Sequence, residues 1–459
     1  MKGCRGSSGT MSEPRPEPLT PPPRMDAFVI NGGQRLRGSV RIHGSKNAAL
    51  PLMAAALLTD EPLMLRDVPD LADIRNMKKL LATLGCQIKD PPQANGDCEL
   101  QVTDRDRCLA HYDLVRTMRA GICVLGPLLG RRGGARVSMP GGCAIGDRPV
   151  DLHLRGLRSL GANIHLDEGY IVAEAPGGRL CGTHVFLGGP NGSTVLGTAN
   201  IMSAAVLAEG RTIIESAACE PEIEDLQTLL NSMGAQVRGG GSPVITIDGV
   251  NRLGGATHDV IPDRIEAGTF ICAAAITNGD VTLENFPTRS LTAALDRFHE
   301  AGVQIDSTAQ TNNRLRETVR AAADRVLRPI HVVTQPHPGF PTDLQAQIMA
   351  LLCLADGNSI ITEKIFPDRF LHVAELMRMG ASLIRSGPSV MVAGTRELTG
   401  APVMASDLRA SAGLVLAGLA ARGQTIVNRV YHLDRGYERM EDALRGLGAD
   451  IQRVDERDL

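Results

Sequence analysis

The fold is decided by the stretch Ile201-Met-Ser-Ala-Ala-Val-Leu-Ala208, which is followed by Gly210-Arg-Thr-Ile-Ile-Glu215 and then by Met233-Gly234-Ala235. The first segment is apolar on every side, which is typical of a helix buried in an interior. The second segment reads as a strand. The glycine in the third follows an amphipathic helix and precedes a β-like run, as at the end of a helix. This stretch predicts a strand, a buried helix, a strand, an exposed helix and a strand.

The same pattern recurs along the whole chain. Its glycine recurs, at spacings of 76, 73, 68, 78 and 68 residues, as Gly85, Gly161, Gly234, Gly302, Gly380 and Gly448. We therefore predict an α/β protein of six βαβαβ-type units, each of about 70 residues. Irregular glycine-rich sequence at 239–255, with a return through Asp263-Arg264, favours two sets of three units. We expect residues 27–30 to pair across the boundary, and a ligand site in the cleft between the sets.

Composition excludes several classes of function. The chain has 48 Lys and Arg against 51 Asp and Glu, a net charge of −3, so no global charge draws it to nucleic acid or an anionic membrane. The absence of Trp and the 3% of aromatic residues disfavour stacking on bases. No run of about 18 apolar residues is present, so we predict no membrane span. Any anion site must therefore be built locally.

The N-terminus and the cysteines indicate the compartment. Residues 1–24 are rich in Pro, Ser and Gly and lack an apolar segment, so we expect a disordered leader, or a start at Met11 or Met25 rather than Met1, and no signal peptide. The ten cysteines include no Cys-x-x-Cys pair, which argues against a zinc site or a thioredoxin-like motif. This cysteine usage fits a reducing cytosol, and we predict a cytoplasmic protein.

Charged loops interrupt the repeats just before the buried helices. Lys46 opens one such helix, where the dipole disfavours a cation, so either a bound anion or an ordinary Ser45 N-cap explains the loop. Arg119 adjoins an apolar run, whereas Arg116 reads as a solvated side chain. Asp343 lies at another helix start and is either a functional carboxylate or an N-cap.

Two further loops carry Asp407 with Arg409, and Asp434 with Arg435, and each of these charges could also be structural. Together the loops supply the cations Lys46, Arg119, Arg148, Arg369, Arg409 and Arg435. Such a set, on equivalent loops of a net-acidic chain, predicts convergence on a small, highly charged anion.

One turn places a thiol among glycines. Cys143 lies five residues before Arg148 in Pro140-Gly-Gly-Cys-Ala-Ile-Gly-Asp-Arg-Pro-Val-Asp151. Glycines let a backbone approach a ligand closely, and a nearby guanidinium favours the thiolate. The alternative is a surface turn with an incidental cysteine. With Asp343, Cys143 would supply a proton donor and acceptor beside an anion. Metal-ligand spacing and nucleotide-binding motifs are both absent from the sequence, so we predict neither a metal nor a cofactor.

Five motifs occur in order: Gly44-Ser-Lys-Asn-Ala-Ala-Leu-Pro51, Pro140-Gly-Gly-Cys-Ala-Ile-Gly146, Arg148-Pro-Val-Asp-Leu-His153, Phe340-Pro-Thr-Asp-Leu-Gln-Ala-Gln347 and Asp434-Arg-Gly-Tyr-Glu-Arg439. Through them the chain, from about residue 25 to its C-terminus, resembles the UDP-N-acetylglucosamine enolpyruvyl transferase family. The resemblance implies an α/β fold of two inside-out α/β barrels with three units each. It implies one discontinuous domain, 25–45 plus 262–459, and a second domain, 46–261, which carries the Cys143 loop.

The resemblance also implies an activity. Family members transfer the enolpyruvyl group of phosphoenolpyruvate to the 3′-hydroxyl of UDP-N-acetylglucosamine and release phosphate, through a tetrahedral intermediate. This is the first committed step of peptidoglycan precursor synthesis. The expected partners are these two small molecules, with no nucleic acid, no membrane and no obligate protein partner.

Residue roles follow from matching motif positions. The resemblance implies that Cys143 donates a proton and forms a covalent adduct with phosphoenolpyruvate, and that Asp343 is the general base. It assigns the donor and its charge to Lys46, Arg119, Arg148 and Arg435. It assigns the acceptor to Asn47, Arg119, Arg148, Pro149, Val150, Asp151, Leu152, Asp343 and Ile365. We also expect substrate contacts from Arg369, Asp407 and Arg409, and contacts to the UDP part from Ser193, Thr194 and Val195.

The chain departs from the family pattern in two places. Residues 188–197 replace the usual diphosphate-binding turn, and residues 307–329 are longer and more basic than expected, which suggests a surface excursion. Two other functions remain open. A 5-enolpyruvylshikimate-3-phosphate synthase would have Lys-Ser where this chain has Lys46-Asn47, and would lack Cys143. A non-catalytic sensor of the UDP-sugar is disfavoured by the intact set of site residues.

Overall fold

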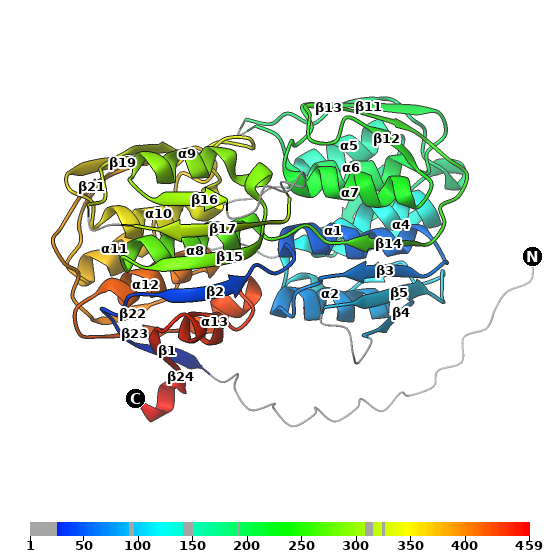
Figure 1. Ribbon diagram of the computed structural model, residues 1–459. Coiled ribbons are helices and arrows are strands. Elements are labelled where there is room, and N and C mark those ends of the chain that lie inside the picture. The colour runs from blue at the N-terminus through cyan, green and yellow to red at the C-terminus, as the bar shows by residue number, and fades with distance from the viewer. Residues whose placement is uncertain (1–24, 91–95, 141–149, 191, 308–314, 324–325) are drawn as a thin grey trace, which may run out of the picture.

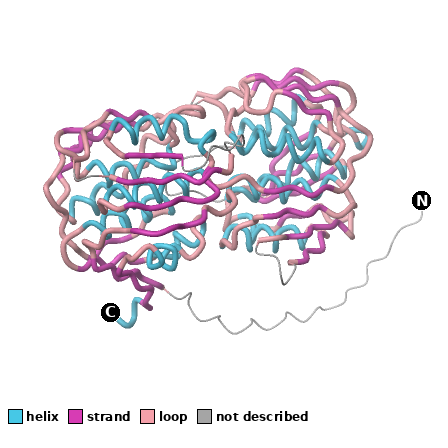
Figure 2. The backbone as a smooth tube through the Cα atoms, in the orientation of Figure 1, coloured by secondary structure: helices cyan, strands magenta, loops and turns pink. Residues whose placement is uncertain are grey.

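The computed structural model describes residues 25–90, 96–140, 150–190, 192–307, 315–323 and 326–459. Figures 1 and 2 show that the helices and strands form two groups that lie side by side. The chain begins in one group, crosses to the other after residue 41 and returns after residue 259. We call the group that contains residues 46–259 the first lobe and the other group the second lobe.

The strands of the described residues form six four-stranded sheets with one common order. In each sheet an outer strand runs parallel to its neighbour and the other two pairings are antiparallel. The sheets of the first lobe are β14 (Ala256–Asp259), β3 (Leu63–Arg66), β5 (Cys98–Val102) and β4 (Cys86–Lys89); β6 (Leu109–Ala110), β7 (Gly134–Ser138), β9 (Tyr170–Glu174) and β8 (Asn163–Asp167); and β10 (His184–Phe186), β11 (Arg211–Glu215), β13 (Val244–Asp248) and β12 (Gln236–Arg238). Those of the second lobe are β2 (Arg37–Arg41), β15 (Asp280–Phe286), β17 (Glu317–Ala322) and β16 (Gln304–Ser307); β18 (His331–Val333), β19 (Asn358–Thr362), β21 (Ser389–Ala393) and β20 (Ser382–Ser386); and β22 (Pro402–Met404), β23 (Gln424–Asn428), β1 (Asp26–Asn31) and β24 (Asp450–Asp455).

Each sheet is accompanied by a buried helix and an amphipathic outer helix. The buried helices are α1 (Lys46–Ala55), α4 (Leu125–Arg132), α6 (Val195–Ala205), α8 (Arg264–Ile276), α10 (Gln345–Leu352) and α12 (Leu408–Ala420). The outer helices are α2 (Ala72–Thr83), α5 (Asp151–Ser159), α7 (Pro221–Ser232), α9 (Thr292–Glu300), α11 (His372–Arg378) and α13 (Met440–Gly446). The short helices are α3 (Tyr112–Val115), η1 (Ala56–Leu58), η2 (Arg119–Val124), η3 (Pro176–Gly178), η4 (Thr288–Leu291), η5 (Thr342–Leu344), η6 (Val430–Arg435) and η7 (Glu456–Asp458).

The repeat predicted from the glycines is confirmed. All six glycines follow an outer helix and have a positive φ, between 81° and 101°. Glycine adopts this left-handed conformation without the strain that a Cβ would cause. The unit has one more strand than predicted, because the chain forms a hairpin after five of the outer helices, as β8 and β9 do after α5. After the sixth, α13, the strand β24 pairs instead with β1 from the start of the chain. The α/β fold of six repeated units stands.

Two expectations about strands need correction. The first strand, β1, does not pair across the lobes but lies between β23 and β24, so the first and last units of the chain share a sheet. The segment 307–329 is not a surface excursion throughout, because its residues 317–322 form β17, an inner strand. The basic side chain of Arg320 lies on the outer face and pairs with Asp280, which explains why the sequence looked like a solvated loop.

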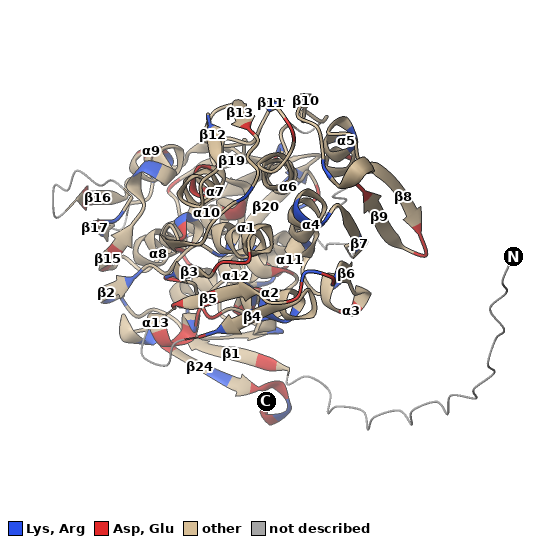
Figure 3. Cartoon of the chain, turned by 90° about the vertical axis from the view of Figure 1, so that its right-hand side faces the viewer, with Lys and Arg blue, Asp and Glu red and all other residues tan. Residues whose placement is uncertain are grey.

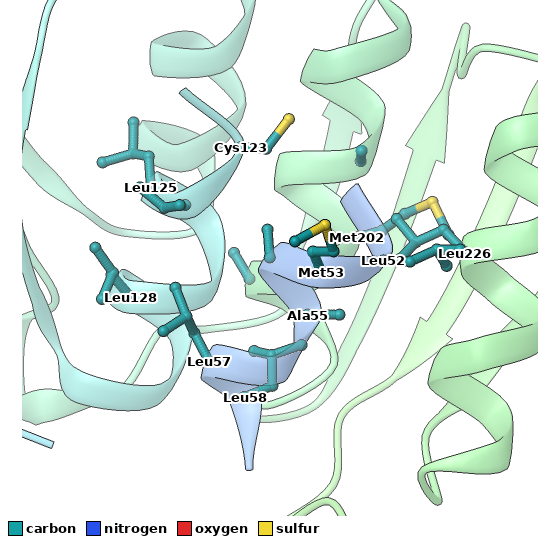
Figure 4. Close-up of a cluster of buried hydrophobic side chains, with 14 of the residues drawn as sticks. Leu52, Met53, Ala55, Leu57, Leu58, Cys123, Leu125, Leu128, Met202 and Leu226 are labelled. Carbon is teal, nitrogen blue, oxygen red and sulfur yellow. The ribbon is translucent and has the colours of Figure 1, made fainter. Parts of the chain in front are cut away.

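Apolar side chains form two separate cores. One cluster extends from Ala48 to Val260, and the other joins residues 28–42 to residues 265–451. Figure 4 shows part of the first, where Leu52, Met53 and Leu57 around α1 lie near Leu128 and Met202 from other buried helices. Full burial of each such side chain contributes about 1.5–3 kcal/mol. The domain limits given by the resemblance stay a prediction that this division supports.

The two connections between the lobes run side by side. The Ser45 N–H donates to the Ile261 carbonyl at 2.7 Å, and the Asp263 N–H donates to the His43 carbonyl at 2.8 Å. Gly44, between them, is so close to the neighbouring backbone that a Cβ would lie 1.8 Å from the Asp67 carbonyl oxygen. These paired connections place the starts of α1 and α8 next to each other.

Positive and negative side chains are mixed in the structure. Figure 3 shows Lys and Arg interspersed with Asp and Glu, rather than gathered on one face of this view. Among the described residues, we find no helix whose length and apolar character would let it cross a bilayer.

Candidate active site

A buried ion-pair cluster joins the two lobes at the start of α1. The Lys46 ammonium donates to Asp73 at 3.2 Å, and Arg435 of the second lobe donates from Nε to the same carboxylate at 3.0 Å. The side chains of Lys46 and Asp73 are only 9% and 4% exposed. Ser45 caps α1 by accepting from the Ala48 N–H. The Ser N-cap is therefore real, and it coexists with a buried cation that needs a partner.

A second cluster is built around Asp343 in η5, directly before the buried helix α10 of the second lobe. Arg369 donates to Asp343 Oδ1 at 2.8 Å, and Arg409 donates to Oδ2 from Nε at 3.2 Å and from Nη2 at 3.0 Å. Both arginines are buried, whereas the Asp343 side chain is 26% exposed. A carboxylate that receives two guanidiniums forms charge-assisted bonds stronger than neutral ones.

Asp343 is not an N-cap, although its position in the repeat is that of one. In the equivalent loops, Asp263 and Asp407 each accept two backbone N–H groups and cap α8 and α12. No side-chain cap is made by Asp343 at η5 or α10. Its carboxylate is thus turned away from the helix and toward the two arginines. This exception within an otherwise regular repeat marks Asp343 as a functional candidate.

The two clusters influence each other electrostatically. Burial would raise the pKa of Asp343, but Arg409, Arg369 and Lys46 hold it well below the ordinary value of 3.8. Burial lowers the pKa of Lys46, and the nearby Arg409 and Arg435 lower it further, against the attraction of Asp73. Four cations and two carboxylates therefore share one region at the junction of the lobes. An excess of buried cations favours the binding of an anion there.

A neutral hydrogen-bond network lies behind Asp343. The Gln347 amide donates to the Asp343 carbonyl at 2.9 Å and to the Tyr437 hydroxyl at 3.1 Å, and that hydroxyl lies 2.8 Å from Thr269 Oγ1. The Arg409 guanidinium carbon lies 5.5 Å from the centroid of the Tyr437 ring. This network fixes the backbone of Asp343 and one wall beside Arg409.

The structure places several other predicted residues in structural contacts. Thr194 caps α6 by accepting from the Gly197 N–H, and Val195 begins that helix. Asp151 begins α5, after the buried Val150. Arg119 begins η2 and, together with burial, lowers the pKa of His153 to about 4. Arg116 is exposed and pairs with Asp113, as expected of a solvated side chain.

The remaining predicted contact residues lie near helix starts or in loops. Asn47 is a half-buried residue of α1, Leu152 belongs to α5, and Ser193 precedes the Thr194 cap. Ile365 is half-buried in the loop after β19. The structure does not by itself assign these residues a ligand.

Three predicted residues, Cys143, Arg148 and Pro149, lie outside the described residues. Cys123, Cys272 and Cys353 are buried in or beside apolar helices, where cysteine packs as a small apolar side chain. Burial raises the pKa of Cys123 and of Cys353 to about 12, so neither thiol is reactive at neutral pH. In the part of the chain that is described, the acidic, His and Cys side chains form no group suited to a metal ion.

Sequence reasoning missed Asp73. It lies near the start of an outer helix, 27 residues from Lys46 and 362 from Arg435, and has no motif of its own. It is also the group that holds both cations in place. The only sequence signal was an acidic residue on the otherwise apolar face of α2, which contains Ile74 and Met77.

Comparison with known proteins identifies the family. A family described as EPSP synthase (3-phosphoshikimate 1-carboxyvinyltransferase) matches residues 30–444. A UDP-N-acetylglucosamine 1-carboxyvinyltransferase of Myxococcus xanthus is 51% identical over 94% of this chain and 99% of the relative. One of Anaeromyxobacter dehalogenans is 53% identical over 94% of this chain and 100% of the relative. The chain belongs to the UDP-N-acetylglucosamine 1-carboxyvinyltransferase family.

Solved structures show that the fold is that of enolpyruvyl transferases. The enolpyruvyl transferase NikO from Streptomyces tendae matches with a TM-score of 0.84 and 24% identity, over 94% of this chain and 99% of that one. An EPSP synthase from Acinetobacter baumannii matches with a TM-score of 0.73 and 18% identity, over 94% and 100%. The predicted two-barrel enolpyruvyl-transferase fold is thereby confirmed.

Proposed function

We propose that this enolpyruvyl transferase moves the enolpyruvyl group of phosphoenolpyruvate to the 3′-hydroxyl of UDP-N-acetylglucosamine and releases phosphate. The observation that carries the proposal is the Asp343 carboxylate held by two buried arginines beside the Lys46–Asp73–Arg435 cluster, in a chain about half identical to proteins of that name. The reaction is the first committed step of peptidoglycan precursor synthesis. We assign it to the cytoplasm, where both small molecules are available.

The donor site is formed by cations from both lobes. Lys46 and Arg435 both pair with Asp73 and are therefore already close together. A phosphate or carboxylate group of phosphoenolpyruvate can bind to both cations without a movement of the lobes. We assign Arg119 and Arg148 to the same anion. Guanidiniums that hold the phosphate also stabilise the charge that develops when it leaves.

The addition step needs one proton donor and one proton acceptor. The Cys143 S–H bond breaks and its proton forms a C–H bond at C3 of phosphoenolpyruvate, which makes C2 electrophilic. The sugar 3′-oxygen then bonds to C2 while its proton passes to Asp343. Elimination breaks the C2–O bond to phosphate and a C3–H bond, whose proton returns to the Cys143 thiolate, and the double bond is restored. The proton held by Asp343 leaves with the phosphate. The same thiolate can instead add to C2 and form a covalent adduct.

Asp343 is a weak base as long as two guanidiniums hold it. Its carboxylate has a lowered pKa because Arg409 and Arg369 favour the charged form. A bound substrate carrying phosphate competes for Arg409, while Arg369 keeps the carboxylate oriented. Binding would therefore raise the basicity of Asp343 at the moment when the sugar hydroxyl is beside it.

The acceptor is assigned to loops around this base. We place Asn47, residues 148–152, residues 193–195 and Ile365 against the UDP-sugar, and Arg369, Asp407 and Arg409 at the edge of the reacting centre. Asp407 caps α12 and Thr194 caps α6, so both residues are held at a fixed helix start.

One assay separates this function from the alternatives. Phosphate release from phosphoenolpyruvate is measured with UDP-N-acetylglucosamine and, in parallel, with shikimate 3-phosphate. We expect turnover with the UDP-sugar only. Turnover with the shikimate compound alone would establish the 5-enolpyruvylshikimate-3-phosphate synthase, and binding of the UDP-sugar without turnover of either acceptor would establish a sensor.

A further inference from the structure

Glu363 is a further acidic side chain near the site, and its carboxylate accepts hydrogen bonds from neutral donors. Glu363 follows β19, and none of its surface is exposed. Its Oε1 accepts from the Thr334 hydroxyl at 2.7 Å and from the backbone N–H groups of Ile365 and Phe366 at 2.8 and 2.9 Å. Its Oε2 accepts from the Thr342 hydroxyl at 2.9 Å. Neutral donors thus surround a buried carboxylate and compensate for its loss of water.

Thr342 connects this carboxylate to the reacting centre. Its hydroxyl donates to Glu363 and accepts from Arg369 Nη1 at 3.0 Å. The same Nη1 donates to Asp343 Oδ1 at 2.8 Å. Since a planar guanidinium has fixed donor directions, an acceptor on one of its N–H groups sets the direction of the other. The chain of contacts therefore runs from Glu363 through Thr342 and Arg369 to Asp343.

We infer that Glu363 and Thr342 are positioning residues, which lock Arg369 against Asp343 and tie both to the loop of residues 363–366. This inference rests on the proposed role of Asp343 as the base and of Ile365 as an acceptor contact. The Glu363 carboxylate then fixes the position of the loop directly and the orientation of Asp343 through Thr342 and Arg369. Neither residue touches substrate in this scheme, so each acts only through its neighbours.

The two oxygens of Glu363 make a selective substitution possible. In Glu363→Gln, the amide oxygen can occupy the Oε1 position and keep all three donors on that side. The amide NH₂ then faces Thr342 and can only donate to its hydroxyl oxygen, so the direction of this bond is reversed and Thr342 loses its charged acceptor. The change therefore alters the link to Thr342 while it preserves the loop. Thr342→Val removes the same link from the other side, and Thr342→Ser keeps the hydroxyl.

The test measures steady-state kinetics of the full-length enzyme variants together with their melting temperatures. We expect Thr342→Val to lower kcat about tenfold or more, with the KM for phosphoenolpyruvate changed less than about twofold, the size of effect that one lost hydrogen bond allows. Thr342→Ser should restore kcat to within about twofold of wild type. Thr362→Val is the matched control, because Thr362 directly precedes Glu363 but its hydroxyl lies 2.9 Å from Ser389 Oγ, outside the chain of contacts to Asp343. It should leave kcat unchanged.

The double variant decides whether the two residues act as one unit. We expect Glu363→Gln with Thr342→Val to be no slower than the slower single variant, because both changes act on the same hydrogen bond. Multiplied losses in the double variant, a normal kcat for Thr342→Val, or equal losses in Thr342→Ser and Thr342→Val would each overturn the proposal. Failure of the underlying function is distinguishable, because it would appear as normal turnover of Asp343→Ala.

Discussion

Among single residues, Asp343 shows best how position in a repeat and role can differ. Asp263 and Asp407 occupy the matching loops and cap their helices, whereas Asp343 holds two arginines. A cap could be replaced at a cost of about 1 kcal/mol, but a carboxylate between two buried cations has a larger structural and chemical role.

Asp343→Ala is expected to lower turnover by at least about a hundredfold, since it removes the proposed general base. It also leaves Arg369 and Arg409 close together without their shared carboxylate, so the melting temperature should fall while the fold is kept. Phosphate release and thermal unfolding measure the two effects. Asp343→Asn is the control for side-chain shape, because it keeps the size of the side chain and removes its charge. Near-normal turnover of both variants would remove the catalytic role.

Cys143→Ala tests the thiol that the sequence places in the glycine-rich turn. The epoxide fosfomycin alkylates thiolates, and buried thiols such as those of Cys123 and Cys353 have pKa values raised by burial. We expect the wild-type enzyme to gain one fosfomycin-derived mass and the variant to gain none. Intact-mass spectrometry measures this, and equal labelling of both proteins would contradict the assignment.

The candidate site could be predicted only where its residues belong to a motif. Lys46, Asp343 and Arg435 lie in short charged loops before or after apolar runs, and these loops are visible in the sequence. Asp73 was missed because its two partners come from other units and one of them lies 362 residues away. Long-range ion pairs depend on how the lobes meet, which no local pattern encodes.

At the scale of elements, the paired connections between the lobes tolerate little change. Gly44→Ala would place a Cβ 1.8 Å from the Asp67 carbonyl oxygen, so the backbone would have to move. We expect a loss of stability of about 1–3 kcal/mol. Gly446→Ala is the matched control, because Gly446 ends α13 and a Cβ added there would meet nothing within 4 Å, so this variant should gain up to about 1 kcal/mol. Urea unfolding of both variants would reveal equal effects if the close approach were unimportant.

The connection through His43 should make stability depend on pH. Burial lowers the pKa of His43, but the hydrogen bond and charge of Glu266 outweigh burial and raise it from 6.5 to about 9, with Glu438 adding to this and Arg41 opposing it. A raised pKa gives stability that is complete below pH 6.5 and is lost as pH rises through 9. The melting temperature of wild type should exceed that of His43→Gln most at about pH 6, by an amount equivalent to about 1 kcal/mol. A difference that grows toward higher pH would contradict this sign.

The fold was predictable at the level of units and less so at the level of strands. Glycines such as Gly161 and Gly448 were visible because a helix that ends in the left-handed conformation needs them. The hairpin that follows an outer helix was missed where two short strands, such as β8 and β9, are joined by a tight turn and read as one β-like run. The inner strand β17 was missed because Arg320, on its outward face, made the segment look like a basic surface loop.

For the molecule as a whole, the order of the chain predicts which part can fold alone. Residues 46–261 contain all twelve strands of the three sheets in the first lobe, together with their helices and the first core. Residues 262–459 lack β1, an inner strand of the last sheet, and β2, an edge strand of another. The first segment therefore has a complete core and the second does not.

We expect a fragment of residues 46–261 to unfold cooperatively and to keep its helices and strands. Glu222 loses its partner Arg264 across the cut, which should lower the melting temperature of the fragment but leave its core intact. Residues 262–459 alone should not fold cooperatively, and joining residues 25–45 to them by a flexible linker should restore the transition, because β1 then completes its sheet between β23 and β24. Circular dichroism and thermal unfolding compare the three fragments. A cooperative transition of residues 262–459 without residues 25–45 would show that β1 and β2 are not needed to complete the second lobe, and the lack of one for residues 46–261 would show that the first lobe does not fold alone.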